Sequence, residues 1–445
     1  MKKNDNPLWR FFASVKLALF TLFFLAATSI IGTLIPQKNP PQFYLENFGP
    51  GGARFIELLD VQDMYASWWF LALLLLFSIN LIVCTFDRLP DVWRMVVLNN
   101  LDTTRDKLAK QPHRLEYLSD EAPETTATTA SGLLAQSGWG PQQAGTLLFS
   151  QKCAWSRLGV YAVHLSILII FAGALIGTFT GFKGSVMIPE GSSADSVFEQ
   201  ISGRPIPLGF EVRCNDFNLS YYADGATPKE FRSELTVRDP ATGETKTEPI
   251  VVNDPLDFKG VTLYQSSYEP MQAFRVTLTQ KNGGKETRFE IPFGEKIHWP
   301  DTNIDFGIIN QQVASRMGDV VSVKFWFSDG KGDPEIFWLN NNASQTITRP
   351  SGAYDVAVSQ MYSTGLQATK DPGVWVVYFG CALMLAGLYV AFFLSHRRVW
   401  IYIDQDAERC RVLVAGTSSK NKLGFEKEFA ALTEQLDRCS TLHRA

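Results

Sequence analysis

The distribution of apolar and polar positions divides the chain into four long apolar segments and the polar stretches between them. The apolar segments cover residues 17–35, 68–86, 158–179 and 374–394, and none of them contains Asp, Glu, Lys or Arg. A helix of about 20 residues crosses a hydrocarbon core about 30 Å thick. The pattern therefore predicts four transmembrane helices. The first segment is too long for the apolar part of a signal peptide, and Pro36-Gln37 is not a small-x-small cleavage site, so we expect it to be retained.

Residues 180–373, between the third and fourth apolar segments, have the pattern of a β domain. Short alternating runs recur at 210–212, 233–237, 261–264, 274–279, 320–327 and 354–361. Turn-forming residues separate them, among them Asp224-Gly225, Asp239-Pro240, Asn282-Gly283-Gly284 and Asp329-Gly330. We predict a β-sandwich or two stacked sheets. The predicted fold class is thus an α+β membrane protein, with four transmembrane helices and a large all-β domain between the third and the fourth.

Two smaller polar stretches, residues 87–157 and 395–445, also carry secondary-structure signals. The predicted elements are strands at 114–117 and 146–151, a helix at 130–136, a hairpin of 399–403 with 411–414, and an amphipathic helix at 425–436. Neither stretch contains a catalytic motif.

Basic residues flank the apolar segments unevenly. They gather before the first segment, after the second, before the third and after the fourth: Lys2, Lys3, Arg10, Lys16, Arg88, Arg94, Lys152, Arg157, Arg397 and Arg398. Lys and Arg are enriched in cytoplasmic loops of membrane proteins. We therefore expect residues 1–16, 87–157 and 395–445 in the cytoplasm, and residues 36–67 and 180–373 on the opposite side of the membrane.

The composition narrows the range of functions. The net charge is −4, which gives no reason to expect a nucleic-acid partner. Six cysteines are scattered without a C-x-x-C pair, which argues against a disulfide framework, a zinc finger, a thioredoxin-like motif and a covalent haem-attachment site. Cys214 is the only cysteine in residues 180–373, and we expect it to be buried. The chain also has no P-loop, G-x-S-x-G, H-E-x-x-H or dinucleotide-binding motif.

Histidine is the residue type that supplies a candidate site. His113 and His443 lie in polar cytoplasmic stretches and are expected to be solvated, His396 adjoins two arginines and is expected to be an interfacial anchor, and His298 is expected to be a surface or hydrogen-bonded residue. His164 differs because it lies inside the third apolar segment, about 9 Å from the cytoplasmic end of the predicted helix. Ionisable residues at such depth are costly and often functional.

The predicted helix around His164 has two contrasting faces. Small residues form one stripe, which we expect to pack against another helix of this chain: Gly159, Ala162, Ser166, Gly173 and Gly177. His164 points roughly 160° away, on a face with Val160, Leu168, Phe171 and Leu175. This face is expected to meet a flat hydrophobic cofactor or another subunit. A hydrogen bond to Asn80, at a similar depth in the second helix, is the alternative role, and such a partner is also compatible with a metal-binding imidazole.

The motifs in order along the chain resemble those of ResB-type membrane proteins of system II cytochrome c biogenesis. The resemblance covers nearly the whole chain. Its motifs are Ser14-Val-Lys-Leu, Ser29-Ile-Ile-Gly-Thr-Leu-Ile-Pro-Gln37, Ser67-Trp-Trp-Phe, Asn80-Leu-Ile-Val-Cys-Thr85, Gly159-Val-Tyr-Ala-Val-His-Leu-Ser166, Gly181-Phe-Lys-Gly-Ser-Val-Met-Ile-Pro-Glu-Gly191, Phe217-Asn-Leu-Ser-Tyr-Tyr222, Val252-Asn-Asp-Pro-Leu256 and Tyr264-Gln-Ser-Ser-Tyr268.

The resemblance implies a function and a location. Such proteins form one part of a haem lyase (cytochrome c synthase) in the bacterial cytoplasmic membrane, which carries haem b across and attaches it to C-x-x-C-H of apocytochrome c. The family's transmembrane haem-ligand histidine corresponds to His164, which would be an axial ligand of the haem iron. The implied partner is a ResC/CcsA-type multi-span subunit with a tryptophan-rich motif. This chain lacks such a tract, so it is expected to be a non-autonomous subunit without catalytic residues of its own.

Two other classes of function stay open at this stage. One is a haem or small-molecule transporter, against which stand the absence of an internal repeat and the single buried ionisable residue. The other is a non-catalytic assembly protein that presents a β domain to another membrane complex.

Overall fold

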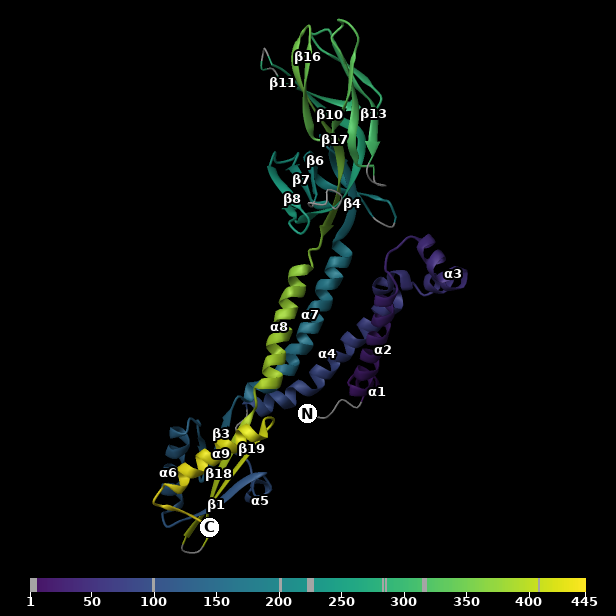
Figure 1. Ribbon diagram of the computed structural model, residues 1–445. Coiled ribbons are helices and arrows are strands. Elements are labelled where there is room, and N and C mark those ends of the chain that lie inside the picture. Colours follow the sequence, from purple (N-terminus) through teal and green to yellow (C-terminus); the bar gives the residue numbers. More distant parts are fainter. Residues whose placement is uncertain are drawn as a thin grey trace. The chain divides into compact units, whose positions relative to one another are not determined.

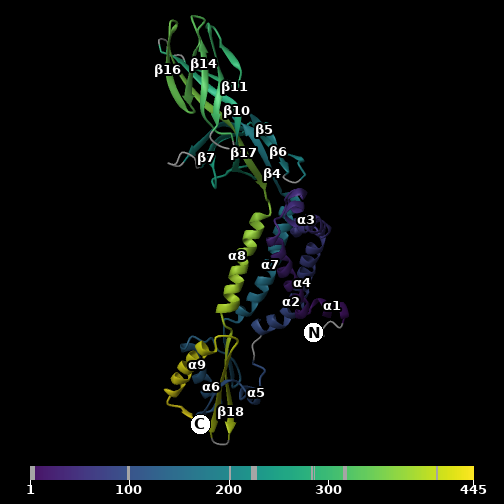
Figure 2. The same cartoon turned by 45° about the vertical axis from the view of Figure 1, so that its right-hand side comes forward.

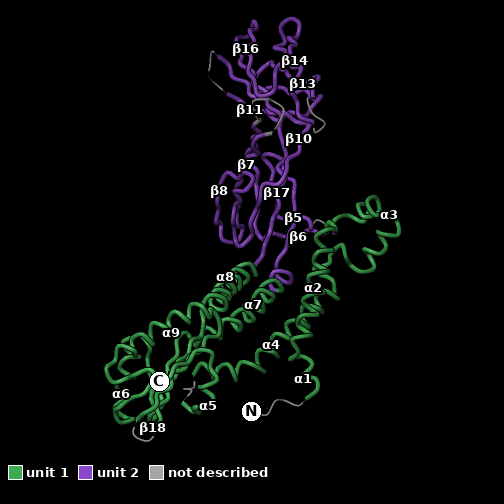
Figure 3. Tube along the Cα trace, turned by 60° about the horizontal axis from the view of Figure 1, so that its bottom comes forward, with its two compact units in different colours: residues 1–175, 373–445 green, residues 176–372 purple. Residues whose placement is uncertain are grey.

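The computed structural model describes residues 6–97, 101–199, 202–221, 228–281, 284, 286–313, 318–406 and 409–445. The predicted turns at Asp224-Gly225 and Asn282-Gly283, and the first five residues of the predicted cytoplasmic N-terminus, lie outside this part of the chain. The chain forms two compact units, one of residues 1–175 with 373–445 and one of residues 176–372 (Figure 3).

Four helices of the chain are long and apolar enough to cross a membrane (Figure 1). They are α2 (Val15–Leu34), α4 (Trp68–Val97), α7 (Gly159–Thr180) and α8 (Val374–Phe393). Three of them agree closely with the predicted segments. The second continues to Val97, well past the predicted end at residue 86, because the hydropathy signal stops at Asp87 while the backbone stays helical. The chain is therefore a membrane protein with a large β-rich region.

Shorter helices that the hydropathy pattern did not predict flank α2. They are α1 (Pro7–Phe12), α3 (Pro41–Leu58) and the 3-10 helix η1 (Val61–Ala66). Asn6 caps α1, since its side chain accepts a hydrogen bond from Leu8 N at 3.0 Å. The helical conformation is then interrupted at Ala13, before α2 begins.

Helices α7 and α8 pack closely and antiparallel through small residues (Figures 1 and 2). The facing pairs, spaced seven residues apart on each helix, are Gly159 with Gly387, Ser166 with Gly380, and Gly173 with Gly373. A Cβ at Gly387 would lie 3.1 Å from the carbonyl oxygen of Gly159, and one at Gly380 would lie 3.2 Å from that of Ser166. Small residues allow such backbone approach in membranes. The predicted packing of the small stripe is thus confirmed for Gly159, Ser166 and Gly173.

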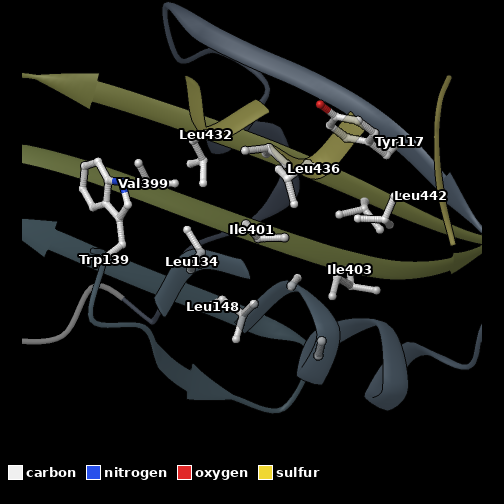
Figure 4. Packing of buried hydrophobic residues seen from close by; sticks show 14 of the residues in the cluster. Tyr117, Leu134, Trp139, Leu148, Val399, Ile401, Ile403, Leu432, Leu436 and Leu442 are labelled. Atoms are coloured by element: carbon white, nitrogen blue, oxygen red, sulfur yellow. The ribbon is translucent and has the colours of Figure 1, made fainter. Parts of the chain in front are cut away.

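The same unit contains a six-stranded sheet assembled from two distant parts of the chain. In sheet order its strands are β2 (Gln142–Ala144), β3 (Leu147–Lys152), β18 (Arg397–Asp406), β19 (Arg409–Ser418), β1 (His113–Ser119) and β20 (Leu442–Arg444). Helices α6 (Pro123–Gln136) and α9 (Lys422–Asp437) cover one face over a core that includes Leu134, Trp139 and Ile401 (Figure 4). The short helix α5 (Arg105–Leu108) packs on the other face with Phe149 and Trp400. Each predicted strand and helix of these stretches is confirmed.

The second unit is all β. Its strands are β4 (Phe182–Pro189), β5 (Ser193–Glu199), β6 (Pro205–Tyr221), β7 (Pro228–Arg238), β8 (Thr245–Val251), β9 (Leu256–Phe258), β10 (Val261–Gln280), β11 (Glu286–Pro292), β12 (Lys296–Trp299), β13 (Ile304–Val313), β14 (Val320–Ser328), β15 (Glu335–Asn340), β16 (Ala343–Arg349) and β17 (Gly352–Lys370). They form a ten-stranded sheet and a four-stranded sheet of β12 to β15.

Two cores hold this unit together, and the long strands β10 and β17 contribute to both. In one core the four-stranded sheet stacks on part of the large sheet, with Phe306 and Phe325 against Val276 and Val356. In the other core, all the buried side chains, Leu235 among them, come from strands of the large sheet. The predicted arrangement of two stacked sheets is therefore present in the first of these two cores.

Cys214 is fully buried in the second of these cores and forms no disulfide, as predicted. Burial, with the nearby carboxylates of Glu190 and Asp216, raises the pKa of its thiol to about 12. A thiol that stays protonated is a poor nucleophile, which excludes a reactive role at neutral pH.

Candidate functional site: a histidine in a transmembrane helix

His164 lies on α7 and forms a hydrogen bond to α4. Its Nδ1 is 3.1 Å from the hydroxyl oxygen of Thr85, and its ring is only half buried. When Nδ1 carries the proton and donates it to Thr85, Nε2 keeps its lone pair. Within the described part of the chain, Nε2 has no hydrogen-bond partner. The geometry therefore gives the imidazole a fixed orientation and one free metal-binding nitrogen.

A cavity of about 420 Å³ lies beside His164 and is formed entirely within the first unit. Its walls come from α2, α4, the 3-10 helix η2 (Ala154–Leu158) and the start of α7, together with the loop between β19 and α9. Val15, Leu81 and Val160 make part of it apolar. Ligand sites of this size with few polar groups are typical of small-molecule and cofactor binding.

Three cationic side chains line the same cavity, and no acidic side chain is among its described lining residues. They are Arg88, Arg157 and Lys420. The ammonium of Lys420 is already engaged, since it donates to the carbonyl oxygen of Ala391 in the last turn of α8. The guanidinium of Arg88 forms no hydrogen bond or ion pair with any described residue.

Arg157 is held by His396, which sequence analysis expected to be an interfacial anchor. That expectation is wrong, because His396 is only 1% exposed and forms hydrogen bonds to two polar side chains. Arg157 Nε donates to His396 Nδ1 at 2.8 Å, and His396 Nε2 lies 3.0 Å from Gln151 Oε1. Burial, Arg157 and Arg398 lower the pKa of His396 to about 4. The ring is therefore neutral at pH 7 and accepts from Arg157.

Asn80 lines the cavity but does not bind His164. Its amide Nδ2 donates to the carbonyl oxygens of Phe12 and Ser14, at 2.6 and 3.1 Å, where the chain breaks between α1 and α2. Asn80 thus stabilises backbone carbonyls that a helix break would leave bare in a membrane. The partner predicted for His164 is replaced by Thr85, one and a half helical turns further along α4. The Oδ1 of Asn80 is buried without a partner among the described residues.

The face of α7 that carries His164 also differs from expectation. We expected it to meet a cofactor or another subunit, but Leu168 and Phe171 pack against α4, with the Phe171 ring 6.4 Å from that of Phe77. Apolar side chains on this face thus fill the space between two helices of the same chain. The cavity lies nearer the start of α7, where His164 and the two arginines line it together with apolar side chains.

Thr85, Arg88 and Arg157 were missed as site residues by sequence reasoning. The sequence analysis used the two arginines only to orient the helices in the membrane. The signal that could have identified them is their position, since each lies close in sequence to a polar residue at the end of an apolar segment. The described residues contain no cluster of three or more His, Cys, Asp or Glu that could bind a metal. His298, in the β unit, is exposed and lies 2.8 Å from Asp305.

The fold and this site define a helical membrane protein with a histidine-bearing cavity among its apolar helices. The sequence profile of the ResB-like family matches residues 15–343 and 331–430, and the chain belongs to that family. The chain is 31% identical over 444 residues to a cytochrome c biogenesis protein CcsB of Gloeobacter violaceus, with 94% of this chain and 89% of that protein covered. It is 27% identical over 451 residues to a cytochrome c biogenesis protein Ccs1 of Porphyra purpurea, with 98% of both chains covered.

Proposed function

We propose that this chain acts in cytochrome c maturation, as a subunit of a membrane cytochrome c synthase that carries haem b across the membrane and helps attach it to C-x-x-C-H of apocytochrome c. Membership of the ResB-like family and the names of its relatives support the first part of this proposal. The haem role rests on the geometry of His164.

The free Nε2 of His164 is the observation that carries the proposal. Imidazole is a common axial ligand of haem iron. A ligating histidine usually donates its other N–H to a fixed acceptor, and Thr85 is positioned to be that acceptor. Haem iron bound to two histidines would need a second imidazole. No other histidine lines the cavity among the described residues, so we assign the second ligand to a partner subunit of the ResC/CcsA type.

The residues around His164 fit haem chemically. Apolar side chains suit the macrocycle, and cationic side chains suit the two propionates. Haem, when bound, supplies the iron and the two vinyl groups that react with the apocytochrome thiols. The chain's own residues hold the ligand, keep its imidazole oriented and exclude water from one face.

The proposed topology follows from the distribution of basic residues. Both termini and the six-stranded sheet would lie in the cytoplasm of a bacterial cell, and residues 180–373 would lie outside the cytoplasmic membrane. His164 would then be near the side on which newly made haem enters. The β unit would lie on the side where apocytochrome c arrives, and we propose that it binds the apoprotein or the partner subunit.

Purification of the full chain with its multi-span partner tests this function. The wild-type complex is expected to carry haem with the absorption spectrum of a bis-histidine species. His164→Ala should lose most of that haem at equal protein level, whereas His298→Ala, which changes an exposed histidine of the β unit, should keep it. Unchanged haem in His164→Ala would contradict the ligand assignment, and a complex that never carries haem would favour a scaffold role.

A further inference from the structure

Two guanidinium groups on the wall of the His164 cavity lack anionic partners. Arg88 forms no ion pair or hydrogen bond with any described residue. Arg157 uses Nε to bind His396, which leaves both of its terminal nitrogens without a described partner. Arg88 is exposed, whereas Arg157 is half-buried, and a cation withdrawn from water is normally paired. The cavity therefore offers donors for negative charge that the chain itself does not supply.

The orientation of Arg157 is fixed by a chain of neutral contacts. His396 Nδ1 accepts from Arg157 Nε, while Gln151 Oε1 lies within hydrogen-bond distance of His396 Nε2. An acidic residue in place of His396 would neutralise the guanidinium. A neutral imidazole instead holds it in place and leaves its charge available.

We propose that Arg88 and Arg157 bind the two propionate carboxylates of haem, and that His396 is a positioning residue that holds Arg157 toward the cavity. This inference rests on the proposed haem role of His164. Arginine binds carboxylates through two parallel N–H donors, and such charge-assisted bonds are the stronger kind of hydrogen bond. The two arginines would fix the edge of the macrocycle while Nε2 of His164 fixes its centre.

An anionic lipid headgroup has the same chemistry as a propionate and could occupy the same arginines at a membrane surface. Three features favour the propionates: both arginines line the same cavity, the cavity wall is otherwise largely apolar, and it includes the metal-binding nitrogen donor. A lipid headgroup would need only the arginines.

The test compares haem with its dimethyl ester, which keeps the iron and macrocycle but lacks both charges. The complex with its partner, stripped of haem and reconstituted in phosphatidylcholine, is titrated with each compound and binding is followed by absorbance. The wild-type complex should bind haem roughly tenfold or more tightly than the ester. Arg88→Gln/Arg157→Gln should bring the two affinities together, while Arg94→Gln, on the same helix but not in the cavity, should keep the preference.

His396 is tested in the same titration. His396→Leu should reduce the preference for haem over the ester, and His396→Asn, which can still accept from Arg157, should restore most of it. His164→Ala should weaken binding of haem and ester by a similar factor, which separates the ligand from the carboxylate site.

Two results would overturn the proposal. One is equal affinity of the wild-type complex for haem and ester. The other is an unchanged preference in the double arginine variant. If that variant, before reconstitution, also lacks phosphatidylglycerol that co-purifies with the wild-type complex, the arginines are assigned to lipid. Neither result bears on His164, whose role fails only if His164→Ala leaves haem binding and its spectrum unchanged.

Discussion

Thr85 determines which nitrogen of His164 is available. Its hydroxyl is the only hydrogen-bond partner of the ring among the described residues and lies 3.1 Å from Nδ1. Without it the imidazole can rotate and either nitrogen can carry the proton, so the ligand has to be ordered when haem binds. A residue that looks like an ordinary helix threonine thus controls the candidate metal ligand.

Replacing Thr85 by valine, which has the same shape without the hydroxyl, should weaken haem binding about 10- to 100-fold. The complex is titrated with haem and followed by absorbance. Thr28→Val is the matched control, because the Thr28 hydroxyl bonds only to carbonyls of its own helix. Equal affinity of the Thr85 variant and the wild type would show that the imidazole is oriented by other contacts.

His396 predicts a pH dependence of stability. Its pKa is lowered from 6.5 to about 4 in the folded protein by burial and by the nearby charges of Arg157 and Arg398. Between these values the unfolded chain binds a proton that the folded chain does not, so stability falls as the pH drops from 6.5 to 4 and is fully present above 6.5. The loss is at most roughly 3–4 kcal/mol.

This dependence is measured as the thermal midpoint of the detergent-solubilised protein at several pH values. His396→Asn, which does not titrate in this range, should flatten the curve between pH 4 and 6.5 relative to the wild type. Parallel curves for the two proteins would mean that folding does not shift the pKa of His396.

At the scale of elements, the contact between α7 and α8 depends on small residues at every seventh position. Gly380→Leu introduces a side chain whose Cβ would lie 2.7 Å from Ile170 Cγ1 and 3.1 Å from Ile170 N. The helices must move apart, and because the His164 cavity includes the start of α7, haem binding should fall together with thermal stability.

The matched control for this substitution is Ala382→Leu, which adds a similar volume on an exposed part of the same helix. It should leave both the thermal midpoint and haem binding within error of the wild type. If the two variants behave alike, the small-residue contact does not hold these helices together.

The elements were predictable from the sequence to different degrees. The four apolar helices were found because each segment is uniformly apolar over a membrane thickness. The true end of α4 was not predicted, because Asp87 and Arg88 end the hydropathy signal but not the helix. Strand β10 was predicted as two separate runs, because polar residues and Pro270 interrupt its alternation where its pairing with β17 shifts register.

At the scale of the whole molecule, the six-stranded sheet joins residues on either side of the β unit in sequence. Its two central strands, β18 and β19, come from the tail, and β3 and β1 pair with them from the earlier segment. The strands could be predicted one by one. Their assembly could not, because period and turn signals are local while the pairing crosses more than 200 residues.

A chain that ends after residue 395 tests this assembly. It lacks β18, β19 and α9, so Trp139 and Leu148 lose most of their buried surroundings. Residues 101–152 should then become sensitive to limited proteolysis under conditions in which the full chain resists. Equal resistance of this segment in the two proteins would mean that it folds without the tail.

The site, like the six-stranded sheet, could be predicted from the sequence only in part. His164 was predictable because a lone ionisable residue stands out in an apolar helix. The partners Thr85 and Arg157 depend on how α4, α7 and the tail meet, which no local pattern encodes. The cavity therefore became visible only when segments far apart in sequence were brought together.

Restoration of the missing ligand tests the central claim most directly. His164→Gly, purified with the partner subunit and supplied with haem, should lack the low-spin bis-histidine spectrum, and added imidazole should bring it back by occupying the vacated position. The His298→Gly complex should keep the spectrum without imidazole. A low-spin spectrum in His164→Gly before imidazole is added would contradict the assignment of His164 as a haem ligand.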